Sequence, residues 1–153
     1  MSEAAPARTD EEILARFRAS VAQPKGSKLL GFEMIAVSQA DKRVEAQFIA
    51  SADFANPMRQ IQGGYLCAML DDVMSVACMV ASGMTHVAPT LEMKTSFLRA
   101  ALADGSTIRG VGRVVKWGKT IAFTEGELWS PDGKLIAKAS GTAMPTPFAK
   151  FRM

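Results

Sequence analysis

The stretch from Gln62 to Ser82 constrains the fold of this chain more than any other. It contains no proline, and its only β-branched residues are three valines, so a long helix is the expected conformation. At about 100° per residue, small and polar side chains fall on one face and apolar ones on the opposite face. The first face holds Gly64, Ala68, Asp71 and Ser75, and the apolar face holds Leu66, Met69, Leu70, Val73, Val76, Ala77 and Val80. The sequence therefore predicts a helix that buries one face and leaves a lane of small residues on the other.

Two adjacent carboxylates, Asp71 and Asp72, stand in the middle of this apolar stretch. Charged groups at this depth argue against a membrane-spanning segment. Asp71 shares the lane of small residues with Ser75, which lies one helical turn further along. Asp72 lies about 100° further round the helix, away from Ser75, and we expect it to face solvent or to cap a neighbouring element. Asp71 is therefore the stronger candidate for a functional acid, and Asp72 is its rival.

The segments on either side of the helix predict the other elements. An acidic start at residues 9–12 opens an amphipathic helix with Val21 in its apolar stripe, so residues 1–27 are expected to form a tail and a helix. A strand at residues 28–39 and its hairpin partner at residues 43–49 follow. After Gly83, alternation and turn residues predict four further strands, at residues 90–98, 106–115, 120–129 and 135–144.

Two strands, one long helix and four antiparallel strands predict an α+β protein. The economical arrangement is a curved antiparallel sheet wrapped around one long central helix, which is the layout of the hotdog fold. This domain would cover residues 28–146, with residues 147–153 as a C-terminal tail. Such a sheet exposes an edge strand and the helix exposes its lane of small residues, so we expect a homodimer that buries both.

Cysteine and charge content narrow the classes of function. Cys67 and Cys78 would lie on one helix roughly 16 Å apart, so they cannot bridge each other within a subunit. Free thiols and a start without an apolar leader segment predict a cytoplasmic location. A single histidine, His86, gives no metal site of useful spacing. The net charge of +3 is too small and too scattered to indicate nucleic acid, and no membrane partner is expected.

Asn56, the run Gln62-Gly63-Gly64 and Asp71 form a spaced motif. It resembles the signature of the PaaI-like branch of hotdog acyl-CoA thioesterases, in which an Asn or Gln is followed by His-Gly-Gly and then by an acid seven residues after the second glycine. The resemblance continues, in the same order, through residues 90–93, 117–123 and 133–137.

This resemblance implies a homodimer, or a dimer of dimers, that hydrolyses acyl- or aryl-CoA thioesters to free acid and CoA. No metal and no cofactor are implied, because CoA enters as part of the substrate. Each site would combine the helix N-terminus of one subunit with the acid of the other. The N–H of Gly63 and the amide of Asn56 would polarise the thioester carbonyl. Asp71 would act either as general base on water or as nucleophile.

Further roles are expected around this motif. Ser75 would hydrogen-bond the attacking water, and Thr90 matches a hydroxyl position used in some family members. Thr90 shares its strand face with neighbouring charged residues, so we expect it to reach the site only if a partner subunit covers that face. Gly64 and Tyr65 are assigned to substrate binding, with the acyl group against the apolar interior near Tyr65 and Met69.

Gln62 stands where the family has its histidine. A glutamine amide still donates and accepts hydrogen bonds, but it cannot supply an imidazolium. Three functions therefore stay open for this chain. One is catalysis of thioester hydrolysis, and the second is a non-catalytic hotdog module that binds an acyl-CoA or a related ligand. The third is a structural dimer without a ligand.

Overall fold

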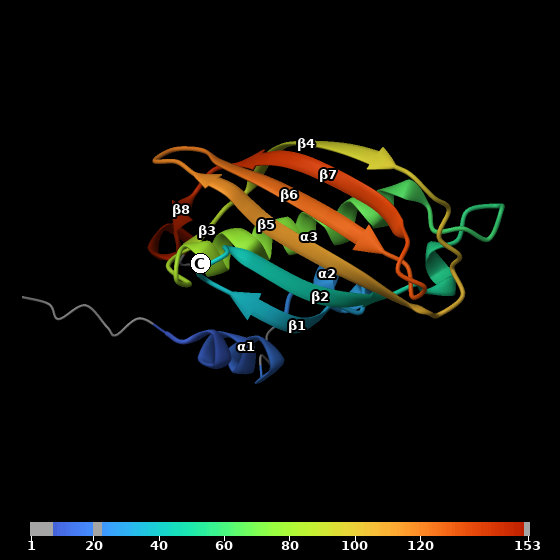
Figure 1. The fold of residues 1–153 in the computed structure, drawn as a ribbon, viewed down its shortest axis with the longest axis horizontal. Coiled ribbons are helices and arrows are strands. Elements are labelled where there is room, and N and C mark those ends of the chain that lie inside the picture. Colours follow the sequence, from blue (N-terminus) through green and yellow to red (C-terminus); the bar gives the residue numbers. More distant parts are fainter. Residues whose placement is uncertain (1–7, 20–22, 152–153) are drawn as a thin grey trace, which may run out of the picture.

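The computed structural model describes residues 8–19 and 23–151. A six-stranded antiparallel sheet curves around the long helix α3, as Figure 1 shows. The order of its strands is β1-β2-β5-β6-β7-β4, so β1 and β4 are the two edges. The predicted α+β hotdog arrangement is confirmed.

The elements follow one another as predicted for most of the chain. The helices are α1 (Asp10–Ala19), α2 (Lys25–Leu29) and α3 (Gly63–Ala81), with 3-10 turns η1 (Ala52–Phe54) and η2 (Phe148–Phe151). The main sheet consists of β1 (Glu33–Ser38), β2 (Arg43–Ile49), β4 (Thr90–Phe97), β5 (Thr107–Trp117), β6 (Ala122–Trp129) and β7 (Leu135–Ala143). A small second sheet pairs β3 (His86–Val87) with β8 (Thr146–Pro147).

Helix α3 is the core of the molecule, and its bounds agree with the predicted helix. Its apolar face is buried as expected, apart from Val76, which is half-buried, and Met74 and Cys78 join the core as well. Length and apolar composition alone would let α3 cross a membrane, but its apolar face already packs on the protein's own sheet.

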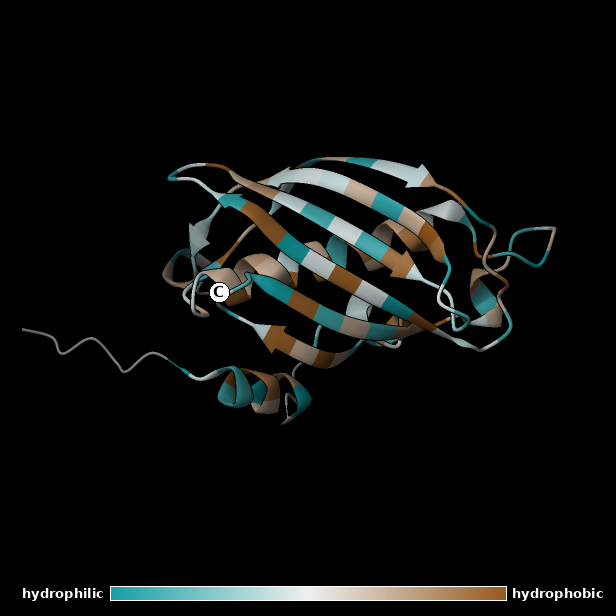
Figure 2. Ribbon diagram, in the orientation of Figure 1, coloured by the Kyte–Doolittle hydropathy of each residue, from teal (hydrophilic) through white to brown (hydrophobic). Residues whose placement is uncertain are grey.

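The strands alternate between the core and solvent, as a sheet with one covered face must. Along β2 the side chains of Val44, Ala46 and Phe48 are buried, whereas their neighbours are not. Figure 2 shows the resulting bands of hydrophobic and hydrophilic residues across the sheet. Five of the six predicted strands agree with the structure to within two residues at either end.

The first strand is the exception, and its predicted start was wrong. Residues 25–29 form α2, so β1 covers only Glu33–Ser38 of the predicted 28–39. The helix ends because Gly31 adopts a φ of 67°, and the N–H of Phe32 then donates to the carbonyl of Ser27. Consecutive leucines at positions 29 and 30 look like the start of a strand, but this glycine-based ending specifies a helical turn.

The first and the last described segments both pack on the domain. Ile13 of α1 is fully buried in the common core, and α1 lies against β1. At the other end, Pro147 of β8 pairs with His86 of β3. The predicted tail covers residues 1–8, of which residues 1–7 fall outside the described residues, as does the predicted contribution of Val21.

A row of glycines lets α3 lie directly on the sheet. A Cβ atom added at Gly112 of β5 would lie 2.1 Å from the carbonyl oxygen of Val73 in α3. Gly126 of β6 pairs with Gly112, and a Cβ atom added at Gly126 would lie 3.0 Å from the Met74 side chain. Because glycine has no side chain, the helix backbone can touch the strands at these positions.

This contact predicts a strong effect of a single methyl group on stability. We expect Gly112→Ala to lower the free energy of unfolding by about 3 kcal/mol or more, because the new Cβ meets main-chain atoms that cannot rotate away. Gly26→Ala in α2 is the matched control, since a Cβ there meets nothing within 4 Å. Urea denaturation of both variants measures the difference. Equal stability of the two variants would show that the helix does not rest on β5.

Candidate functional site

The first turn of α3 presents a free backbone donor. The side-chain Oε1 of Gln62 accepts the N–H of Gly64 at 2.8 Å and so caps the helix. The main-chain N–H of Gln62 donates to the carbonyl of Phe54 at 2.8 Å. Among the described residues, the N–H of Gly63 has no hydrogen-bond partner. This N–H lies at the positive end of the helix dipole, where an anionic oxygen is stabilised.

The loop before α3 is organised around Asn56. Its Oδ1 accepts the N–H of Met58 at 2.9 Å and the N–H of Gln60 at 3.1 Å. Its own N–H donates to the carbonyl of Gln60 at 2.7 Å, which closes the loop. With Oδ1 fully used, the side chain of Asn56 has only its NH₂ group left to offer, and an NH₂ group is a donor.

Asp71 and Thr90 are brought together within one chain. The Thr90 hydroxyl donates to Asp71 Oδ1 at 2.5 Å. The expectation that Thr90 needs a partner subunit to reach this acid was therefore wrong. The pairing of β4 with β7 shifts register between Thr90 and Glu92. Because of this bulge, Thr90 does not share the strand face of Glu92, as strict alternation along the strand would predict.

The free N–H of Gly63 and the Asp71 carboxyl do not form one site within a single chain. Eight residues separate them along one helix, which is roughly 12 Å at the standard rise. Free N–H groups at a helix N-terminus also point away from the body of the helix. An oxygen bound at Gly63 would therefore lie still further from Asp71.

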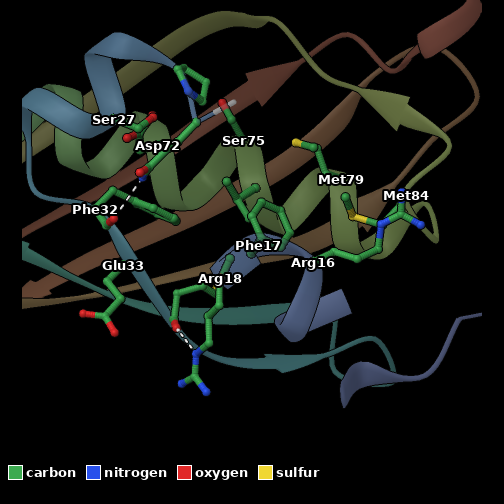
Figure 3. A pocket seen from close by; sticks show the side chains of 14 residues that line it. Arg16, Phe17, Arg18, Ser27, Phe32, Glu33, Asp72, Ser75, Met79 and Met84 are labelled. Atoms are coloured by element: carbon green, nitrogen blue, oxygen red, sulfur yellow. Dashed lines mark hydrogen bonds between the residues drawn. The ribbon is translucent and has the colours of Figure 1, made fainter. Parts of the chain in front are cut away.

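A second feature of α3 is a cavity of about 730 Å³ that opens between this helix, α1, α2 and β1 (Figure 3). Both Asp72 and Ser75 line it. The expectation that Asp72 lies away from Ser75 was therefore wrong. The reason is α2, which was not predicted and which brings Ser27 to the wall beside Asp72.

The Asp72 carboxyl is unusual in its surroundings. Burial raises its pKa, the Ser27 hydroxyl lowers it in part, and the neighbouring Asp71 raises it further. Its Oδ2 atom is buried and has no hydrogen-bond partner in the part of the chain that the structure describes. The sequence signal for this half-buried acid is the pair of consecutive carboxylates on an apolar helix. Only one of the two can lie in the lane of small residues, so the other must lie elsewhere on the helix surface.

The residues expected to hold the acyl group lie in different environments. Gly64 is exposed on the first turn of α3, and Tyr65 stacks on Phe54 with ring centroids 4.2 Å apart. Met69 is fully buried in the core and so lies behind the accessible surface of the helix. The position of the acyl group against the apolar interior near Tyr65 and Met69 therefore stays a prediction.

The Cys78 thiol is free and buried. Burial raises the pKa of the Cys78 thiol to about 12, so this thiol stays protonated at neutral pH. Within residues 8–19 and 23–151, no group of three or more His, Cys, Asp or Glu side chains is arranged to hold a metal ion.

Comparison with known proteins agrees with this geometry. The sequence profile of the Thioesterase superfamily matches residues 61–137. A phenylacetic acid degradation-related protein of Ralstonia eutropha JMP134 is 35% identical, with 86% of this chain and 98% of that chain covered and a TM-score of 0.75. The chain belongs to the thioesterase superfamily. A search of curated proteins finds no match.

Two more distant structures share the fold. The PaaI protein from the phenylacetic acid degradation operon of E. coli is 20% identical, with a TM-score of 0.73 over 89% of this chain and 91% of that chain. A protein of Streptococcus mutans whose structure is bound to acetyl-CoA is 22% identical, with a TM-score of 0.66 over 76% of this chain and 89% of that chain. The predicted PaaI-like hotdog relationship is confirmed.

The raised pKa of Asp72 predicts a pH-dependent cost to stability. The native state binds the Asp72 proton more tightly than the unfolded chain does. Ionisation of Asp72 therefore lowers the free energy of unfolding progressively as pH rises from the ordinary pKa of 3.8 through the raised value. We expect Asp72→Asn to be more stable than the wild type near neutral pH, and this advantage to shrink toward pH of about 4. Chemical denaturation across this pH range measures it.

Asp53→Asn is the control for that experiment, because it removes one negative charge from an exposed residue. A stability difference for Asp72→Asn that stays constant with pH, or that matches the Asp53→Asn difference, would contradict the buried position of the Asp72 carboxyl.

Proposed function

We propose that this protein hydrolyses acyl-CoA thioesters to a free acid and CoA. The observation that carries the proposal is the pair of features on α3, a free N–H at Gly63 and a hydrogen-bonded carboxyl at Asp71. Membership of the thioesterase superfamily and the acetyl-CoA-bound relative from Streptococcus mutans support the same substrate chemistry.

The donors at the start of α3 fit the first half of the reaction. As the thioester carbonyl carbon is attacked, negative charge develops on the carbonyl oxygen. The N–H of Gly63 and the NH₂ group of Asn56 would stabilise that charge, and fixed donors of this kind are effective because they need no reorganisation. The glutamine at position 62 supports this arrangement, since its Oε1 holds the N–H of Gly64 and leaves that of Gly63 free.

Asp71 fits the second half. As a general base it would take a proton from water as the water oxygen bonds to the carbonyl carbon, and that proton would then pass to the CoA sulfur as the carbon–sulfur bond breaks. As a nucleophile it would form a mixed anhydride that water then hydrolyses. In either role the Thr90 hydroxyl fixes one carboxylate oxygen and leaves the other available.

A second copy of the chain would complete the site. The roughly 12 Å between Gly63 and Asp71 exceeds the separation at which groups act on one carbonyl, so each site would take its donors from one subunit and its acid from another. Strand β4 is a free edge of the sheet and carries the exposed apolar residues Leu91 and Phe97. The ring of Phe97 lies against Gly63, and pairing of β4 with a second copy would bury both features. We propose a cytoplasmic homodimer or dimer of dimers.

The direct test is thiol release from a panel of aliphatic and aromatic acyl-CoAs. We expect Asp71→Asn to lower kcat by about 100-fold or more on the substrates that the wild type turns over, because the amide can neither accept the proton nor attack. Asp53→Asn is the matched control, since it removes an exposed carboxylate elsewhere and should leave kcat unchanged.

Two results would change the conclusion. A folded wild type that binds acyl-CoA without turnover would favour the non-catalytic binding module instead, with Gln62 in place of the family's histidine as its cause. Turnover that is indifferent to Asp71→Asn would remove Asp71 from the site.

A further inference from the structure

Arg59 adopts an unusual backbone conformation in the loop before α3. Its φ of 60° lies in the left-handed region, which glycine occupies freely and arginine only at a cost in free energy. Among the described residues, two others that are not glycine share it: Lys42, in the turn between β1 and β2, and Met84, just after α3. Those two lie at the ends of regular elements, whereas Arg59 lies in the loop of Asn56, one of the two proposed donors to the thioester carbonyl.

Main-chain hydrogen bonds hold Arg59 in this conformation. Its N–H donates to the Asn56 carbonyl at 2.9 Å, and its own carbonyl accepts the N–H of Ala103 at 3.0 Å. The next residue, Gln60, donates its N–H to Asn56 Oδ1 at 3.1 Å. A glycine at position 59 would make the same main-chain bonds without strain, so the fold does not explain the arginine. Strain that is retained beside a reaction centre indicates a side chain with a function.

The guanidinium of Arg59 is free to bind a ligand. The residue is exposed, and in the part of the chain that the structure describes its side chain makes neither an ion pair nor a hydrogen bond. Other arginines are engaged: Arg99 donates to the Leu135 carbonyl at 3.2 Å, and Arg113 pairs with Glu125. A planar guanidinium with unused donors suits a phosphate group, which it binds through two parallel hydrogen bonds.

The loop presents this guanidinium on the solvent side of the carbonyl donors. The bond from the Arg59 N–H to the Asn56 carbonyl closes a four-residue turn, so the Cα atoms of these two residues lie within about 7 Å of each other. Pro57, Met58 and Arg59 are all exposed. The phosphates of an acyl-CoA must stay hydrated or find charged partners. A substrate whose carbonyl is bound at Asn56 would meet such a partner on the outer surface of the same loop.

We propose that Arg59 binds a phosphate of the CoA half of the substrate and so makes the site selective for CoA thioesters over thioesters of uncharged thiols. This inference rests on the proposed thioesterase function. Arg59 binds the substrate and takes no part in bond making or breaking, so it lowers KM and leaves kcat unchanged. The strain at Arg59 is then a loss of stability that recognition retains.

Thioesters that differ only in their thiol half test the proposal. The acyl group that the wild type hydrolyses fastest is attached to CoA, to 3′-dephospho-CoA and to pantetheine, which carries no phosphate. We expect Arg59→Gly to raise KM for the CoA ester by about 10-fold or more, the loss of a charge-assisted hydrogen bond, with kcat unchanged. KM for the pantetheine ester should stay the same. A KM effect that persists on the dephospho ester assigns the pyrophosphate, and one that disappears there assigns the 3′-phosphate; both results support the proposal.

Lys42→Gly is the matched control. It also removes one positive charge and also places a glycine at a left-handed position, in a hairpin turn outside the candidate site. We expect both variants to unfold at a higher urea concentration, because glycine relieves the strain, and only Arg59→Gly to raise KM for the CoA ester. An unchanged KM in Arg59→Gly, an equal rise for the CoA and pantetheine esters, or an equal rise in Lys42→Gly would overturn the proposal.

Failure of the proposed function gives a different pattern. If the folded wild type turns over no ester, calorimetry with free CoA and with pantetheine decides the inference. Tighter binding of CoA than of pantetheine, lost in Arg59→Gly and kept in Lys42→Gly, upholds the phosphate site without catalysis. Equal binding of the two compounds, or no binding of CoA, overturns it.

Discussion

The contact between the backbone of α3 and the strand β5 fixes the position of both carboxyl groups in the middle of this helix. At Gly112 there is no room even for a methyl group between the strand and the carbonyl of Val73. The helix therefore cannot rotate or slide without a main-chain clash. Asp71 and Asp72 lie within two residues of Val73, so the same contact sets which acid faces Thr90 and which faces the cavity. Close packing of this kind gives a site its precision.

The helix offers two kinds of chemistry at two places along its length. Its first turn offers backbone N–H groups and no acid, and its middle offers carboxylates and no free N–H. Neither place is sufficient for thioester hydrolysis, which needs charge stabilisation and proton transfer at one carbonyl. A second copy, covering the free edge at β4, would bring the two together. This is why an isolated chain of this fold would hold all the groups and no complete site.

The fold was largely predictable from the sequence, because patterns that extend over many residues decide it. An apolar helix without breakers and strands with a period of two left one economical arrangement. The errors arose where a short element or a one-residue irregularity decides the outcome. The helix α2 is specified by a glycine ending, and the orientation of Thr90 depends on a bulge. Local features of this kind leave little trace in a periodicity. Asp72 was misjudged for the same reason, since its cover comes from the unpredicted α2.

The most direct test of a site shared between subunits is complementation between two inactive variants. Asp71→Asn lacks the acid, and Asn56→Ala lacks one of the donors. In an equal mixture of refolded subunits, half of the dimers are mixed, and each mixed dimer has one site with both groups intact. We expect recovery of roughly a quarter of the wild-type activity. A mixture that stays as inactive as its two components, with exchange of subunits verified, would show that donors and acid belong to the same chain and would rule out a site shared between subunits.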